Sequence, residues 1–118
     1  MIPNLEEIRQ DTEVTYNKLL SETVKSLCSG WGIAINTAGK INGQSKITFD
    51  PAKDPNLFSI SWSISCDAVY LAVMEFVKAG YKVELHYCNK SSKMADRITI
   101  SWDKDIPKNN LIITYEKK

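Results

Sequence analysis

A segment in the middle of the chain is apolar on almost every side, and it restricts the fold more than any other feature. If residues 67–79 form a helix, only Asp67, Glu75 and Lys78 in it are charged, and Gly80 is suited to end it. A helix that is hydrophobic all round has to be buried on more than one side. We therefore expect it to be covered either by the first helix of the chain, packing across its back, or by another chain.

The N-terminal segment has the pattern of an amphipathic helix. Asn4 and Glu7 have the three-residue spacing of a capping box, and Gly30 is a natural end, so we expect a helix over about residues 4–28. Its less polar positions recur at steps of three and four residues and form a single stripe. The stripe comprises Leu5, Ile8, Thr12, Tyr16, Leu19, Leu20, Thr23 and Leu27. This stripe is wide enough to pack against only one neighbouring element.

Alternation of apolar and polar residues predicts the strands, and residues 57–65 alternate most regularly. The other predicted strands are residues 31–36, 45–49, 81–88, 97–102 and 111–115. The element order is then α-β-β-β-α-β-β-β, without the regular crossovers of a doubly wound parallel sheet. We expect a two-layer α+β fold with a mostly antiparallel sheet of five to six strands and two helices on one face. The 118 residues and 13.3 kDa suit one domain, residues 1–118.

The two faces of the predicted sheet differ in chemistry. One face collects large apolar side chains and should form the core: Phe58, Ile60, Trp62, Val83, Leu85, Ile98, Ile100 and Trp102. The opposite face collects hydroxyl and charged side chains, which either contact only water or form the floor of a ligand site. As a ligand site, this face would use Ser61, Ser63, Lys82, His86, Arg97 and Thr99.

The residues that could carry catalysis or hold a metal are few and scattered. His86 and Cys88 share a strand face, but side chains two residues apart on a strand lie roughly 7 Å apart, too far for a direct hydrogen bond. Cys28, Cys66 and Cys88 lack the closely spaced pair that zinc sites usually show. We therefore expect no catalytic residue, no metal and no cofactor. Three thiols without a disulfide pattern favour a reducing cytoplasm.

Composition argues against two further classes of partner. The 15 basic and 14 acidic residues leave a net charge of +1, which disfavours binding to nucleic acid. No apolar run approaches the roughly 18 residues of a membrane span, and the acidic N-terminus lacks the apolar core of a secretory signal.

Isoleucine, lysine and asparagine account for 34 of the 118 residues, a bias that fits an AT-rich genome such as that of a phage or a low-GC bacterium.

These observations favour a small, non-enzymatic accessory or regulatory protein that acts by protein–protein contact, with another protein or a second copy of itself as partner. The contact surface would be the apolar surplus of the second helix, at Tyr70, Val73, Met74 and Val77. The alternative is a protein that binds a small ligand or a nucleotide on the polar face of the sheet.

Overall fold

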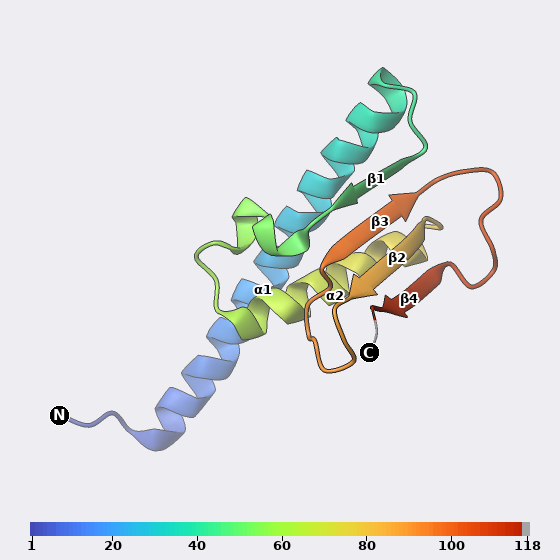
Figure 1. Cartoon of the computed structure of the whole chain (residues 1–118). Helices are drawn as coiled ribbons and strands as arrows, with labels where there is room; N and C mark the ends of the chain where they lie inside the picture. The colour runs from blue at the N-terminus through green and yellow to red at the C-terminus, as the bar shows by residue number, and fades with distance from the viewer. Residues whose placement is uncertain (117–118) are drawn as a thin grey trace.

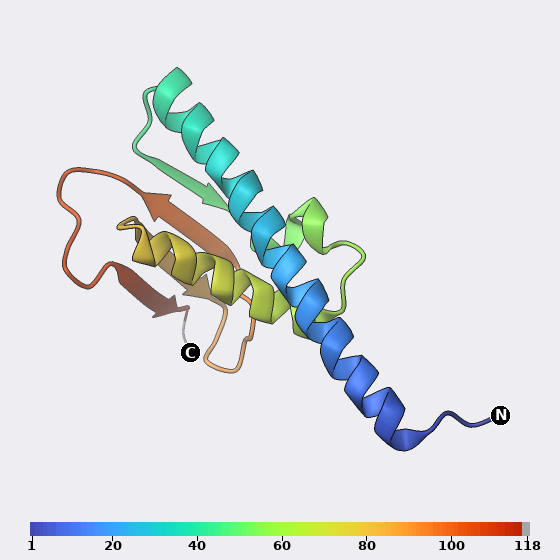
Figure 2. The same ribbon diagram turned by 180° about the vertical axis from the view of Figure 1, so that it is seen from behind.

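The computed structural model describes residues 1–116 and has an α+β fold (Figure 1). Its elements are α1 (Leu5–Asn36), which continues as a π-helical turn (Thr37–Ile41), then β1 (Lys46–Phe49), two 3-10 turns (Pro51–Lys53 and Pro55–Leu57), α2 (Trp62–Lys78), β2 (Lys82–Tyr87), β3 (Arg97–Ser101) and β4 (Leu111–Tyr115). Both helices lie on one face of the sheet, as Figure 2 shows from behind. The predicted class, with two helices over one sheet face, is therefore confirmed.

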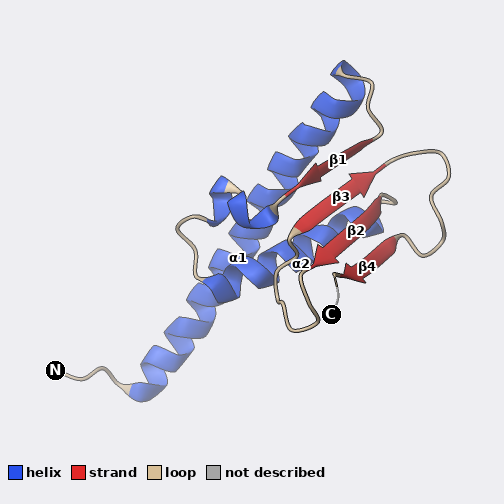
Figure 3. Cartoon of the chain, viewed as in Figure 1, coloured by secondary structure: helices blue, strands red, loops and turns tan. Residues whose placement is uncertain are grey.

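The sheet has four strands in the order β1-β3-β2-β4 (Figure 3). Strand β3 is antiparallel to both β1 and β2, but β4 is parallel to β2. The expectation of five to six mostly antiparallel strands is thus wrong in number, and the sheet is mixed.

Asn110 explains the parallel pair. Its side-chain amide donates hydrogen bonds to the backbone carbonyls of Val77 (2.9 Å) and Tyr81 (2.7 Å), and its backbone carbonyl accepts one from Val83 N–H (2.8 Å). These bonds hold the start of β4 beside the start of β2.

The predicted strand over residues 57–65 is wrong, because this stretch runs from the end of a 3-10 turn at Leu57 into the beginning of α2 at Trp62. The Ser61 hydroxyl caps α2 by accepting a hydrogen bond from Ile64 N–H. Phe58 and Trp62 are therefore not core residues, and 70% and 59% of their surfaces are exposed. Helical spacing governs burial from here on, at the positions Ile64, Ser65, Ala68, Val69, Ala72 and Val73.

The predicted strand over residues 31–36 is also wrong, because α1 runs through Gly30 and Gly32 to Asn36. Each glycine costs a helix about 1 kcal/mol relative to alanine. The buried residues Leu27, Trp31 and Ile35 offset that cost, because their four-residue spacing places them on the core side of the helix. The Trp31 indole also donates to Asp54 (3.1 Å).

The core lies between the sheet and the two helices. Its fully buried members include Leu27, Val73, Val83, Leu85, Ile98 and Ile100. Burial of the β2 and β3 residues in this set confirms the inward face that alternation predicts for those strands. Trp102 is partly buried and packs against the same cluster.

Helix α1 extends well beyond this core at its N-terminal end (Figure 1). The projection contributes to the elongated outline of the molecule, whose extents are 59 × 36 × 25 Å. The last attachment of α1 to the body is at Tyr16, whose hydroxyl donates to the carboxylate of Asp67 in α2. Every residue from 5 to 15 is exposed, so residues 16–116 leave this part of the helix largely uncovered.

Candidate functional site: an uncovered helix stripe and three hollows

The apolar stripe of α1 is covered along only half of its length. Thr23 and Leu27 are buried in the body, whereas Leu5 and Ile8, on the same side of the helix, are 60% and 46% exposed. The exposed positions, which we call the uncovered stripe, are Leu5, Ile8, Thr12, Thr15 and Leu19. Their alternating three- and four-residue spacing is that of a surface suited to packing against another helix.

A shallow hollow of about 330 Å³ lies where α1 leaves the body. It is bounded on α1 by Ile8, Thr15 and Leu19, and on α2 by the buried side chain of Ile64. The uncovered stripe thus passes directly into a concave apolar surface. Such a junction offers a partner helix contacts from both helices of the body.

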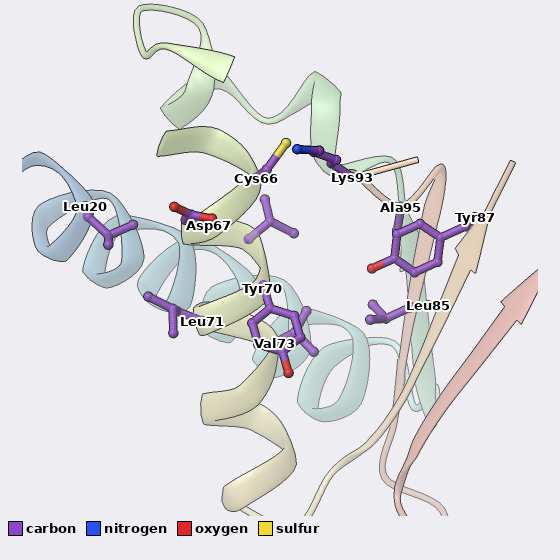
Figure 4. A pocket seen from close by; sticks show the side chains of 11 residues that line it. Leu20, Cys66, Asp67, Tyr70, Leu71, Val73, Leu85, Tyr87, Lys93 and Ala95 are labelled. Carbon is purple, nitrogen blue, oxygen red and sulfur yellow. The ribbon is translucent and has the colours of Figure 1, made fainter. Parts of the chain in front are cut away.

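A second hollow, of about 460 Å³, lies along α2 (Figure 4). Leu20 of α1 borders it on one side, and Leu85 and Tyr87 of β2 border it on the other. Tyr70 and Leu71 of α2 are substantially exposed beside it. Its lining is mainly apolar, with Lys93 and Asp67 as its charged members.

The four predicted interface residues of α2 do not share one exposed surface. Tyr70 is exposed and Met74 is half-buried, but Val73 is completely buried and Val77 packs against the core. Val73 therefore cannot contact a partner. The all-round hydrophobicity of α2 has two sources within the chain, because the sheet covers one side and α1 packs on another. A further uncovered apolar surface lies on α1, on the stripe for which the sequence predicts only one neighbour.

The thiol of Cys66 and the phenol of Tyr87 in the α2 hollow are held neutral. Burial raises the pKa of the Cys66 thiol, and the nearby charge of Lys93 opposes this only in part. Burial, followed by the neighbouring Tyr115 and Tyr70, raises the pKa of the Tyr87 hydroxyl. Both groups are protonated at neutral pH, so these two side chains are not activated as nucleophiles.

The open face of the sheet carries a connected row of polar side chains. Lys82 pairs with Glu84 (3.3 Å), and a second oxygen of Glu84 lies 3.7 Å from His86 Nε2. His86 Nδ1 lies 2.8 Å from the Thr114 hydroxyl. On the same face, the hydroxyls of Thr48 and Thr99 lie 2.9 Å apart. Most of these groups therefore already have partners within the chain.

The structure brings together four of the six predicted ligand-binding residues. Lys82, His86, Arg97 and Thr99 lie on the same face of the sheet, as strand alternation predicts, but Thr99 is buried there. Ser61 and Ser63 do not join them, because they lie at the beginning of α2, where Ser61 acts as the cap. Sequence reasoning missed Thr114, although alternation along the last strand places it on the polar side.

A hollow of about 280 Å³ lies at the end of this face. Arg97, His86 and Thr114 line it together with Asp96 and Glu116. The positive charge of Arg97 would attract an anion to this hollow, but the two carboxylates would repel it. This hollow is therefore better suited to a neutral polar group than to a phosphate.

Residues 1–116 contain no group of three or more His, Cys, Asp or Glu side chains placed to hold a metal ion. Within the same residues, neither helix has the length and apolar content needed to cross a membrane. Comparison with known proteins finds no matching family model, no matching curated protein and no matching solved structure.

Proposed function

We propose that this protein is a non-enzymatic binding protein that acts, as an accessory or regulatory factor, by contact with another protein. The observation that carries the proposal is the uncovered stripe of α1. An amphipathic helix whose apolar side faces water over residues 5–15 is suited to packing against a surface supplied by a partner.

The energetics support contact at this stripe. Burying a large aliphatic side chain is worth about 1.5–3 kcal/mol, and both Leu5 and Ile8 are available for such burial. The projecting segment is continuous with the buried part of α1, but its exposed residues gain little from packing, so it frays more readily than the rest of the helix. A partner that packs on the stripe would therefore stabilise the helix as well as bury its apolar side chains.

Site-specific photo-crosslinking in the native host tests the proposal. Ile8 is replaced by the photoreactive residue benzoylphenylalanine, and Val14 is replaced in the same way as the control. Val14 is 67% exposed on the same helix but points away from the stripe. We expect crosslinks to protein from position 8 and few from position 14. Equal labelling from both positions, or none from position 8, would contradict the proposal.

A second candidate function is the binding of a small polar ligand at the open sheet face. The hollow beside Arg97, His86 and Thr114 is the observation that favours it. A thermal-shift screen of neutral polar metabolites, with nucleotides as the charged comparison, would test it, because a ligand at 100 times its Kd adds about 2.7 kcal/mol of stability. The shift should disappear in Arg97→Ala. If no compound shifts the melting temperature of the unmodified chain, this candidate is wrong.

A further inference from the structure

We infer that the partner of the uncovered stripe is a second copy of this chain, with the two α1 helices packed antiparallel over residues 8–19. This inference rests on the proposed function and specifies the partner. Its basis is that the α1 surface complements itself in both shape and charge.

The spacing of the stripe permits helix-to-helix packing. Leu5, Ile8, Thr12, Thr15 and Leu19 occupy the two apolar positions of successive heptads. In an antiparallel pair, one register sets Ile8 opposite Leu19 of the second copy and Thr12 opposite Thr15 of the second copy. The same contacts recur by two-fold symmetry, so the contact surface is closed and self-complementary. The contact then consists of two pairs of aliphatic side chains and two pairs of threonines, a composition that predicts a dimer of moderate affinity.

Charge selects this register over its neighbour. Asp11 and Lys18 flank the stripe on the same side, and neither forms an ion pair with any other residue between positions 1 and 116. With Ile8 opposite Leu19, Asp11 of each copy lies opposite Lys18 of the other. The next register, one heptad away, sets Asp11 opposite Asp11 and Arg9 opposite Arg9. Like charges in that register disfavour it, whereas opposite charges in the first one favour it.

The hollow at the base of the projection provides a further contact. In the selected register, Ile8 of the second copy reaches the level of Leu19, where Ile64 forms the far wall of the hollow. The tip of one projecting helix would therefore be buried against both helices of the other copy. The body of each subunit supplies part of the binding site for its partner.

Sedimentation equilibrium on the purified chain tests the inference, over concentrations from about 5 to 200 µM. We expect the mass to rise from 13.3 kDa towards twice that value. Asp11→Lys or Lys18→Asp alone turns two attractions into repulsions and should raise the dimer Kd about tenfold. The double variant Asp11→Lys with Lys18→Asp should restore the original Kd to within about twofold. Glu13→Lys, an equal charge change away from the pair, is the matched control, and circular dichroism checks that each variant folds.

The possible results separate the inference from the proposed function. A mass of 13.3 kDa at the highest concentration would overturn the dimer. A double variant that stays as weak as the single ones would overturn the antiparallel register. If position 8 crosslinks to a different protein while the purified chain is monomeric, the proposed function holds and this inference fails. If position 8 also forms no crosslink, both fail.

Discussion

The hydroxyl of Tyr16 donates a hydrogen bond to the carboxylate of Asp67, and this bond marks the place where α1 separates from the body. Toward the C-terminus, α1 contributes Thr23, Leu27 and Trp31 to the buried interior. Toward the N-terminus, the same helix carries its apolar side into water. The bond therefore divides α1 into a structural half and a half available for binding.

Removal of this bond should loosen the projection without damaging the core. In Tyr16→Phe the Asp67 carboxylate loses its donor, so α1 should fray further into the segment around Tyr16. Hydrogen exchange of the backbone amides of residues 12–20 should become faster, with little change in the amides of β2 and β3. Unchanged exchange in residues 12–20 would show that the bond does not anchor the helix.

Loss of the N-cap should affect the projection alone. The Asn4 side chain accepts a hydrogen bond from Glu7 N–H (3.0 Å), and Asn4→Ala removes it at a local cost of about 0.5–2 kcal/mol. We expect lower helical ellipticity with an unchanged melting temperature, because residues 5–15 make few contacts with the body. A large fall in melting temperature would mean that the projection and the body unfold as one unit.

Two apolar residues should differ sharply in their importance for stability. Leu85 is 2% exposed, so Leu85→Ala should cost about 2–5 kcal/mol of unfolding free energy. Phe58, which alternation assigns to the core, is largely exposed, and Phe58→Ala should cost about 0.5 kcal/mol or less. Urea unfolding of both variants measures the difference. Equal losses would contradict the placement of Phe58 outside the core.

Stability should fall on the alkaline side of neutrality. Burial raises the pKa of Cys28, Cys66 and Tyr87 above the ordinary values of about 8.5 for a thiol and 10 for a phenol. The folded state therefore holds these protons more tightly than the unfolded state. The contribution to stability is fully present below the ordinary pKa values and is lost as pH rises through the raised ones.

Urea unfolding at intervals between pH 8 and 11 measures this effect, and the Tyr87→Phe variant is its control. The phenol of residue 87 is absent in that variant, so its stability should fall less steeply above about pH 10. If the two proteins follow the same curve, Tyr87 does not contribute to the alkaline loss.

Local patterns could predict much of the sheet but not all of its strands. Alternation in residues 81–88 and 97–102 fits only a strand with one buried face, and both strands form there. Residues 57–65 alternate even more regularly, yet a helical spacing begins within them at Ile64 and continues through Ala68 to Ala72. The cap at Ser61 and the packing of that helical face decide in favour of α2. Two patterns coexist in this stretch, and only tertiary contacts distinguish them.

The candidate site depends on features that no local pattern contains. The sequence predicts one continuous stripe on α1, but which half is covered depends on where α2 and the sheet end in space. The parallel direction of β4 likewise depends on contacts of Asn110 with Val77 and Tyr81, far away in the chain. Lys82, His86, Arg97 and Thr99 could be placed on one face because alternation along each strand, with the apolar side inward, determines which way their side chains point.

Hydrogen exchange of the backbone amides of residues 9–15, measured at two protein concentrations, tests most directly whether a second copy covers the stripe. At low concentration the projection has no packing partner, and its amides should exchange much faster than those of the core strands. At a concentration well above the dimer Kd, we predict marked slowing in these residues and no change in the core strands. Identical, fast exchange at both concentrations would contradict the account.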